Sequence, residues 1–524
     1  MNKYFILILS LGVFFSCTST KNRNTTKDDG LIEITFLQMN DVYEIAPLSD
    51  GTGGLARVAT IRKELLAKNP NTFTVLAGDF ISPSVIGTLK HEGKRIRGKQ
   101  MVDVMNAVGV DWVVFGNHEF DYDDYSDLQA RLDESKFTWF GTNARFMPDP
   151  NVAATPFFKN KNGAKENCPD DQVFELKDAD GTTIKLGLFG VLLDTGKKPW
   201  VTYSNWFDAA KKTQEKLRSQ ADVSIGLTHL VVSDDLKLAA MLPDVPLLMG
   251  GHDHENQRHI VGNTVVAKAD ANAKTVYIHT LKYNKKTKKS TLTSELRVVD
   301  SKIADEPVTA ATIAKWEKIK LDALSSSGFD ANATVVKLSG TLDCRETTIR
   351  RKQAPVGEII NQAMVKAAKT KLDCAFFNSG SIRIDDILSG TLNEIDIVRM
   401  LPFGGGLSEV QMTGSLLRKT LTAHTGNEGN GGYLQLWQIA QAADGNWVIN
   451  GQPLNDKTLY KVMLPDFLLT GAEQNMGFLK TTITEVETGK TNNPDMPVVV
   501  KPNSKDKQDL RNDIRLALIQ YWRG

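Results

Sequence analysis

The sequence lacks several features that would place it at once in a common class of protein. Its 524 residues carry a formal net charge of only +1. The chain therefore lacks the excess of positive charge that would indicate nucleic acid as a partner. Besides Cys17 the chain has three cysteines, none of them in C-x-x-C spacing: Cys168, Cys344 and Cys374. One disulfide could form among them, but the sequence does not choose the pair. It also shows no internal repeat.

The longest apolar run lies at the N-terminus. Lys3 precedes residues 4–15, a run shorter than the roughly 20 apolar residues of a membrane span and typical of a signal peptide. Ser16-Cys17 follows it and resembles a bacterial lipoprotein cleavage site. We expect a signal peptide at residues 1–16, a lipid on Cys17, a tether at 17–30, and an exported lipoprotein anchored on a periplasmic or cell-surface face. Ordinary secretion with an incidental cysteine is the alternative.

The chain from residue 31 to about residue 248 alternates β-rich runs with segments of helical periodicity. Helices are expected at residues 55–67, 100–108, 125–132 and 206–218, between strands at 32–38, 73–76, 112–115, 138–141, 184–189, 223–227 and 247–249. This order indicates α/β layers with functional residues on loops at the strand ends.

The length of the chain predicts more than one domain. We expect a first unit at residues 31–302 and a second at residues 333–524. Residues 303–332 would connect them, and the charged, helix-prone composition of residues 303–324 favours a helix there.

Residues of the kind that bind metals gather on loops that follow predicted strands. Five segments carry them: residues 40–43, 78–79, 116–121, 226–229 and 250–254. Four of the eight histidines fall within these segments, which argues against a chance arrangement. Two divalent ions about 3.5–4 Å apart need a bridging carboxylate, neutral imidazoles and further oxygen or nitrogen donors. The sequence therefore predicts a dinuclear metal site.

The order D-x-(H), G-D, G-N-H-(E), H, G-H-x-H is similar to that of calcineurin-like metallophosphoesterases. With its second half, the chain resembles the 5′-nucleotidase family over nearly all of residues 31–521. The resemblance implies an α/β fold, a four-layer sandwich of two sheets flanked by helices, followed by a smaller α+β substrate-binding domain. It also implies two divalent metal ions, with Mn, Zn, Fe, Co and Mg as candidates.

The resemblance also implies a role for each metal-site residue. Asp79 would bridge the two ions. The other metal ligands would be Asp41, Tyr43 and His254 for the first ion, and Asn117, His229 and His252 for the second. His118, oriented by Asp121, would stabilise the transition state or protonate the leaving oxygen.

Three segments of the second unit carry the resemblance on the substrate side: residues 378–383 (N-x-G-x-I-R), 401–404 (L-P-F-G) and 467–473. Two phenylalanines would sandwich the nucleobase, a contact worth about 1–3 kcal/mol per base. The implied substrate-binding residues are Phe403, Phe467, Asn378, Arg383, Arg350 and, for the ribose, Glu473. Glu473 replaces the family's Asp and Ala472 its second Gly, which leaves other nucleotide substrates open.

Tyr43 stands where the family has histidine. It either coordinates the first ion as a phenolate or turns aside and leaves the position to water. Asp41, Asp79 and His254 remain in both cases, and three protein ligands with an open position suffice for a catalytic ion.

These observations predict a metal-dependent phosphoric ester hydrolase that removes the 5′-phosphate of nucleoside monophosphates by metal-activated water, for nucleotide salvage outside the cytoplasm. Its partners would be the nucleotide substrate and, through Cys17, a membrane. One alternative is a hydrolase of 2′,3′-cyclic nucleotides, sugar nucleotides or NAD that uses the same site. The other is a catalytically impaired nucleotide-binding lipoprotein. The sequence does not define the oligomeric state.

Overall fold

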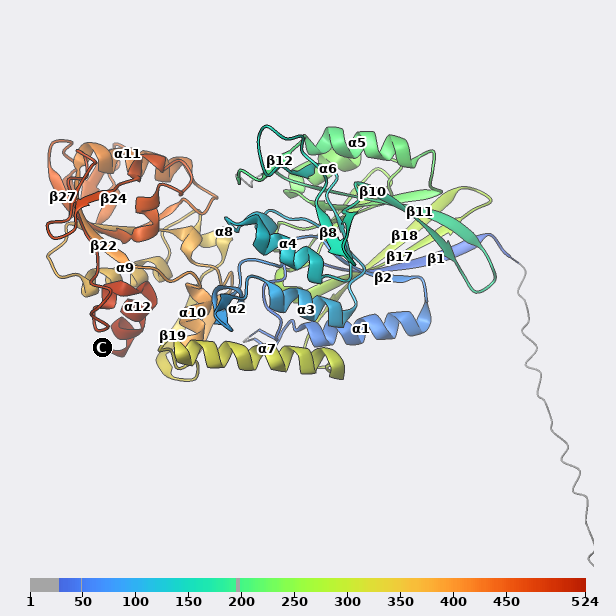
Figure 1. The fold of residues 1–524 in the computed structure, drawn as a ribbon, viewed down its shortest axis with the longest axis horizontal. Helices are drawn as coiled ribbons and strands as arrows, with labels where there is room; N and C mark the ends of the chain where they lie inside the picture. The colour runs from blue at the N-terminus through green and yellow to red at the C-terminus, as the bar shows by residue number, and fades with distance from the viewer. Residues whose placement is uncertain (1–27, 49, 195–197) are drawn as a thin grey trace, which may run out of the picture.

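The computed structural model describes residues 28–48, 50–194 and 198–524. The expected signal peptide, Cys17 and most of the tether lie outside the described residues. Figure 1 shows two units side by side, the N-terminal one in blue to green and the C-terminal one in orange to red. Helix α7 (Pro307–Ser326) runs along one side of the molecule, beside α1 (Leu55–Lys68) and α3 (Lys99–Val108), and points toward the C-terminal unit.

The N-terminal unit contains two six-stranded sheets. The first has the order β18-β17-β1-β2-β5-β6 and the second β10-β11-β13-β14-β16-β15. Strands β1, β2, β5 and β6 are parallel neighbours, as are β11, β13, β14 and β16. The strands of the first sheet are β1 (Leu31–Met39), β2 (Thr72–Leu76), β5 (Trp112–Val114), β6 (Thr138–Phe140), β17 (Thr275–Asn284) and β18 (Lys289–Val298). Those of the second are β10 (Asp171–Lys177), β11 (Thr183–Leu192), β13 (Val223–His229), β14 (Leu247–Gly250), β15 (Gln257–Val261) and β16 (Thr264–Lys268).

The two sheets pack face to face, and helices cover their outer faces. Side chains of β1 such as Ile34 and Phe36 lie buried with Leu188 and Ile225 of the second sheet. Leu37 lies on the opposite face of β1 and packs among the helices, because successive side chains of a strand alternate. The covering helices are α1 (Leu55–Lys68), α3 (Lys99–Val108) and α4 (Tyr125–Glu134) on the first sheet, and α5 (Trp206–Leu217) and α6 (Val232–Met241) on the second. The predicted four-layer sandwich is confirmed.

The helix predicted in the connector is present as α7. Pro307 occupies its first turn, and the Glu306 carboxylate accepts a hydrogen bond from the Thr309 amide at 2.7 Å. Proline and a carboxylate both favour a helix start, which explains the beginning of α7. α7 packs against α1 and α3.

The C-terminal unit is built on a seven-stranded sheet of order β23-β20-β27-β22-β30-β29-β28. Along β20, Ala375 and Phe377 face α9 and α12, whereas Cys374 and Phe376 face α11, so helices cover both sides. The sheet contains β20 (Cys374–Asn378), β22 (Leu407–Thr413), β23 (Leu434–Trp437), β27 (Leu459–Pro465), β28 (Ile483–Glu485), β29 (Lys490–Thr491) and β30 (Val498–Val500). Its helices are α9 (Pro355–Ala367), α11 (Gly414–Gly426) and α12 (Ile514–Arg523). This is the expected smaller α+β unit.

Shorter elements complete the molecule. Strands β19 (Thr334–Asp343) and β21 (Ile387–Asn393) pair beside α8 (Glu346–Ile349) and α10 (Glu394–Met400). The remaining ones are α2 (Val85–Thr88), β3 (Lys90–His91), β4 (Lys94–Arg95), β7 (Ala144–Phe146), β8 (Phe158–Lys161), β9 (Ala164–Asn167), β12 (Val201–Tyr203), β24 (Ile439–Gln441), β25 (Trp447–Ile449) and β26 (Gln452–Pro453).

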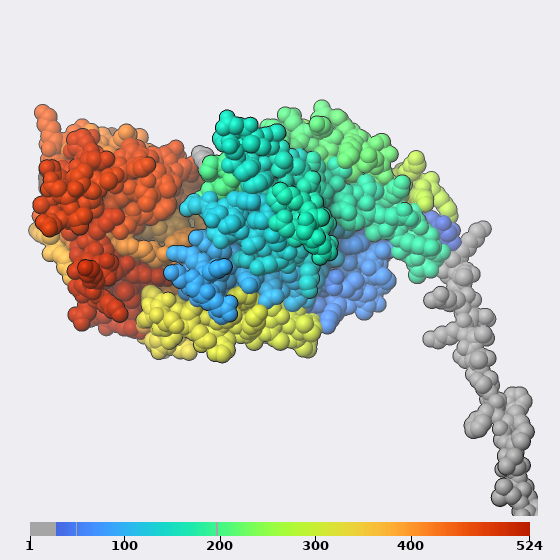
Figure 2. Space-filling view, viewed as in Figure 1, coloured from blue at the N-terminus to red at the C-terminus, as the bar shows by residue number. Residues whose placement is uncertain are grey.

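The two units share a continuous set of buried side chains. It runs from Met39 through Ile313 and Trp316 of α7 to Val356 and Leu518 of the C-terminal unit. Figure 2 shows α7, in yellow, in contact with both the blue and the red parts of the surface. The relative position of the units therefore rests on apolar packing as well as on contacts at the site.

Within the described ranges, no helix is long and apolar enough to span a membrane. The three cysteines of this part of the chain are buried and free: Cys168, Cys344 and Cys374.

Candidate active site

The five predicted loops meet at one edge of the sandwich. Asp41 follows β1, Asp79 follows β2, and His118 follows β5, all from the first sheet. His229 ends β13, and the loop after β14 carries His252 and His254. Because these strands are parallel within each sheet, their carboxyl ends lie at the same edge, and the loops come together there.

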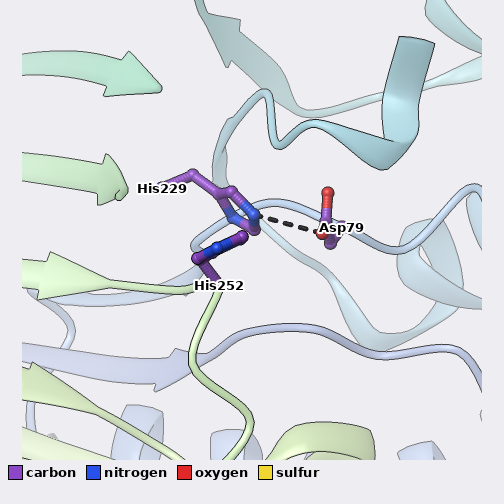
Figure 3. Close-up of side chains that lie close together, drawn as sticks. All are labelled: Asp79, His229 and His252. Carbon is purple, nitrogen blue, oxygen red and sulfur yellow. Dashed lines mark ion pairs between the residues drawn. The ribbon is translucent and has the colours of Figure 1, made fainter. Parts of the chain in front are cut away.

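Three of the predicted ligands form a compact group of metal-binding atoms. Figure 3 shows Asp79 and His252, from separate loops, and His229, at the end of β13, pointing toward one another. One donor atom from each lies within 4.8 Å of the others. His229 Nδ1 donates a hydrogen bond to the Ala77 carbonyl at 2.7 Å, which leaves Nε2 facing Asp79 Oδ2 at 3.1 Å. Asn117 Oδ1 lies 3.2 Å from nitrogens of both histidines.

A second group lies on the other side of Asp79. His254 Nε2 is 3.6 Å from Asp41 Oδ1. The Tyr43 hydroxyl lies 3.4 Å from Asp41 Oδ1, 3.4 Å from Asp79 Oδ2 and 3.3 Å from His254 Nε2. Tyr43 therefore points into the site and does not turn aside.

The backbone holds these residues in an unusual conformation. Asp41 and Asp79 have φ angles of 52° and 58°. These lie in the left-handed region, which residues other than glycine rarely adopt. The buried Glu119 carboxylate accepts hydrogen bonds from the amides of Asp79, at 2.9 Å, and Gly116, at 2.6 Å. A Cβ on Gly116 would lie 2.1 Å from Asp79 Oδ1, so the glycine of G-N-H-E is needed for this close approach. Such strain persists only where surrounding contacts fix it.

The charge balance of the site favours a bound cation. Asp41 and Asp79 are 0% and 1% exposed. Burial raises the pKa of Asp41; it would also raise the pKa of Asp79, but His229 and His118 lower that pKa below its usual range. Burial and the two carboxylates raise the pKa of Tyr43 well above its usual value. Buried carboxylates that face one another are costly without a compensating cation, so these donors fit divalent ions.

The predicted catalytic pair is also assembled. His118 Nδ1 lies 2.8 Å from Asp121 Oδ2, which accepts a further hydrogen bond from the Ser82 hydroxyl at 2.8 Å. Burial alone would lower the pKa of His118, but Asp121 and Asp79 raise it above its usual value. Arg383 of the C-terminal unit places Nη2 at 3.1 Å from His118 Nε2.

The predicted substrate residues occupy several places in the C-terminal unit. Arg383 and Arg350 both pair with the Glu346 carboxylate. Asn378 Nδ2 donates a hydrogen bond to Glu473 Oε2 at 2.7 Å, and burial raises the pKa of Glu473.

The two predicted stacking rings are both accessible. Phe403 is 57% exposed and Phe467 47%. Their loops are neighbours, because Leu407 of β22 pairs with Pro465 of β27. Phe403 also lines a hollow of about 610 Å³ beside α7 and Arg515.

Sequence reasoning missed three residues that support the site. Asp385 and Glu346 approach it from the C-terminal unit, and Lys268 holds the β14 loop through the Gly251 carbonyl at 2.7 Å and Asp253 Oδ2 at 2.6 Å. Asp385 follows the N-x-G-x-I-R segment by two residues, a signal that was available in the sequence.

Each of the two units is similar to a known protein family. A profile for calcineurin-like phosphoesterases matches residues 34–256, and a profile for the C-terminal domain of 5′-nucleotidase matches residues 331–481. The 5′-nucleotidase of Bos taurus is 25% identical over 84% of this chain and 83% of its own length. The trifunctional nucleotide phosphoesterase YfkN of Bacillus subtilis is 26% identical over 77% of this chain, which corresponds to 28% of its own length.

A solved structure has the same fold over most of the chain. The 5′-nucleotidase precursor of Thermus thermophilus covers 94% of this chain and 96% of its own, with a TM-score of 0.70 at 17% identity. The sandwich and its carboxylate–imidazole group are thus those of a calcineurin-like phosphoesterase. The second domain matches the C-terminal domain of 5′-nucleotidase, and the chain is similar to 5′-nucleotidases over most of its length. It is a metal-dependent phosphoric ester hydrolase and uses divalent metals. The prediction of an enzyme is confirmed, and the alternative of an impaired binding protein is not supported.

Proposed function

We propose that this protein removes the 5′-phosphate from nucleoside monophosphates. The observation that carries the proposal is the contact between Arg383 and His118, at 3.1 Å, beside the metal-binding group. A guanidinium from the C-terminal unit and the donors of the N-terminal unit thereby converge on one place that suits a phosphate.

The proposed metal ligands are those expected from the sequence. Asp79 would bridge two divalent ions; Asp41, Tyr43 and His254 would hold one of them, and Asn117, His229 and His252 the other. When bound, the ions would neutralise phosphate charge and activate water for attack on phosphorus.

The other site residues would act on the substrate directly or through a neighbour. Asp121 accepts the Nδ1 proton of His118 and raises the pKa of the imidazole, so that a second proton on Nε2 could stabilise the developing charge or pass to the leaving oxygen. Arg383 and Arg350 would bind phosphate oxygens. Phe403 and Phe467 would stack on the base, and Asn378 and Glu473 would contact the nucleoside.

Phosphate release from AMP, compared with glycerol phosphate at equal concentration with added manganese, tests this proposal. A strong preference for AMP is expected, because only AMP can use the aromatic pair. Equal and rapid rates would retain the metal chemistry and reject the stacking role. No release from either substrate would contradict the nucleotidase proposal.

A second candidate is hydrolysis of 2′,3′-cyclic nucleotides, sugar nucleotides or NAD at the same site. The observation that favours it is the Asn378–Glu473 hydrogen bond, which already engages the carboxylate expected to grip the ribose. The similarity to a trifunctional nucleotide phosphoesterase also supports it. Assaying the three substrate classes beside AMP decides between them, since the preferred substrate has the highest kcat/KM.

We also propose export, with residues 1–16 removed and a lipid on Cys17, for nucleotide salvage outside the cytoplasm. Residues 31–302 and 333–524 would act as domains joined by residues 303–332. Radiolabelled palmitate should enter the full chain but not its Cys17→Ser variant in a bacterial host. Equal labelling of both would reject the anchor.

A further inference from the structure

One histidine of the metal-binding group is held by a carboxylate from the other unit. His254 Nδ1 lies 2.5 Å from Asp385 Oδ2, and the two residues are 131 positions apart. The opposite ring nitrogen, Nε2, faces Asp41 at 3.6 Å and the Tyr43 hydroxyl at 3.3 Å. The imidazole of His254 therefore spans the gap between the metal-binding group and the C-terminal unit.

The Asp385 carboxylate is itself fixed. Its Oδ1 accepts a hydrogen bond from the Glu346 amide at 2.7 Å, so each oxygen has a defined partner. Asp385 has a φ angle of 44°, in the left-handed region, which an aspartate adopts only where contacts maintain it. Both side chains of the His254–Asp385 pair are only 16% exposed. A carboxylate with so little freedom sets the orientation of the ring bonded to it.

Asp386, the next residue along the chain, makes different contacts. Asp386 Oδ1 lies 3.5 Å from Lys274 Nζ and accepts a hydrogen bond from the Ile387 amide at 2.8 Å. Asp386 thus also joins the two units, but through a surface lysine. It provides a matched comparison for Asp385 within the same loop.

We propose that Asp385 is a positioning residue for His254, and that metal binding at the Asp41–Tyr43–His254 side and packing of the two units stabilise each other. A carboxylate that accepts the Nδ1 proton holds the lone pair on Nε2 and increases its basicity toward a metal. Because Asp385 can do this only while the C-terminal unit is in place, the metal must in turn favour that arrangement, since coupling between two binding events is reciprocal. The inference rests on the proposed metal ligands and not on the identity of the substrate.

Titration of the full-length, metal-free protein with cobalt(II) tests the positioning role. Visible absorption of cobalt reports its coordination, and no nucleotide is needed. In Asp385→Asn, the cobalt affinity of the site that contains His254 should fall about 10- to 100-fold, the usual effect of removing a carboxylate that is bonded to a metal-binding histidine. The affinity of the other site should stay unchanged. Asp386→Asn should retain both affinities. Unchanged affinities in folded Asp385→Asn, or equal loss of both, would overturn the proposal.

A double-mutant cycle separates positioning from a general effect on the fold. If Asp385 acts through His254, then Asp385→Asn should cost little further cobalt affinity in a His254→Ala background. The same loss in both backgrounds would show that Asp385 does not act through this histidine. Circular dichroism of all four proteins confirms that each is folded.

Hydrogen exchange tests the coupling between metal and units. Cobalt should slow exchange of the segment containing the Glu346 amide, which is bonded to Asp385, and should slow it less in Asp385→Asn. Exchange in α11, on the far face of the C-terminal sheet, is the internal control. Exchange around Glu346 that does not respond to cobalt would overturn the reciprocal part of the proposal. Because AMP is absent throughout, a failed nucleotidase assay would leave both results intact.

Discussion

The metal side and the substrate side of the site are built differently. On the metal side, Asp41 and Asp79 are almost fully buried, and Glu119 ties the Asp79 loop to the loop after β5 through the amides of Asp79 and Gly116. On the substrate side, Phe403, in a turn, and Phe467, in the short 3-10 helix after β27, are 57% and 47% exposed. The first side is organised before any ligand arrives, whereas the second presents surface that a ligand must cover. Changes on the metal side should therefore affect every substrate, and changes at the rings only those with a base.

The largest effect is expected from Asp79→Asn, which keeps the shape of the proposed bridging residue and removes its charge. Rates on AMP and on glycerol phosphate should both fall about 1,000-fold or more, because metal catalysis contributes several kcal/mol. Initial rates of phosphate release measure this, with Asp208→Asn, an exposed residue of α5, as control. If Asp79→Asn retained activity on one substrate and lost it on the other, the proposal that the metal side affects every substrate would be contradicted.

The next effect is expected from Phe403→Ala and Phe467→Ala. Each should lower kcat/KM for AMP about 5- to 150-fold, which corresponds to about 1–3 kcal/mol of stacking, and leave glycerol phosphate unaffected. Steady-state kinetics on the two substrates measure the split. Val486→Ala, which truncates a side chain that is 88% exposed, is the control for removal of surface apolar area. Equal losses on both substrates would mean that the rings support the fold.

A smaller effect is expected from Tyr43→Phe, which removes the hydroxyl facing Asp41, Asp79 and His254. Affinity for one metal ion should fall about tenfold, as for loss of a group close to the metal. A phenolate ligand also gives iron-loaded protein a visible charge-transfer band, which this variant should lack. Calorimetry and absorption spectra measure the two changes. The phenolate ligand would be ruled out by colourless iron-loaded wild type together with unchanged affinity in the variant.

The smallest effect is expected at the connector, in Glu306→Gln. Hydrogen bonds from Lys63 and Thr309 lower the pKa of Glu306 from its usual 4.5 to about 2. The folded state therefore binds the ionised form better, so the stabilisation is present above pH 4.5 and is lost as the pH falls toward 2. The variant should lose about 1 kcal/mol of stability near pH 7, the usual value of a helix cap, and less near pH 3.

Urea unfolding at the two pH values measures this difference. Asp322→Asn, which breaks an exposed pair with Lys318 on the same helix, is the control and should change stability by less than about 0.5 kcal/mol. A loss in Glu306→Gln that does not depend on pH would show that the carboxylate contributes through packing alone.

The sequence predicted the site best where its residues lie directly after parallel strands. A loop after a parallel strand emerges at the same edge as its neighbours, so Asp41 and Asp79 of one sheet could be placed together without coordinates, as could His229 and His252 of the other. The helix in the connector was also predictable, from its composition. Strands with weaker patterns, such as β10 and β15, and helix α6 were not identified. β10 and β15 are the edge strands of the second sheet and are partly exposed, so few of their residues are apolar and the hydrophobic signal is weak.

The sequence by itself determined the chemistry of the site, because the residue types and their order after successive strands define a carboxylate–imidazole metal group and predict a catalytic histidine beside it. Only the tertiary structure decided which way Tyr43 points, and that Arg383 and Asp385 reach His118 and His254 from the other unit. These contacts join residues 265 and 131 positions apart. Their formation depends on how the two units pack through the buried side chains that they share with α7, and no local pattern in the sequence carries that information.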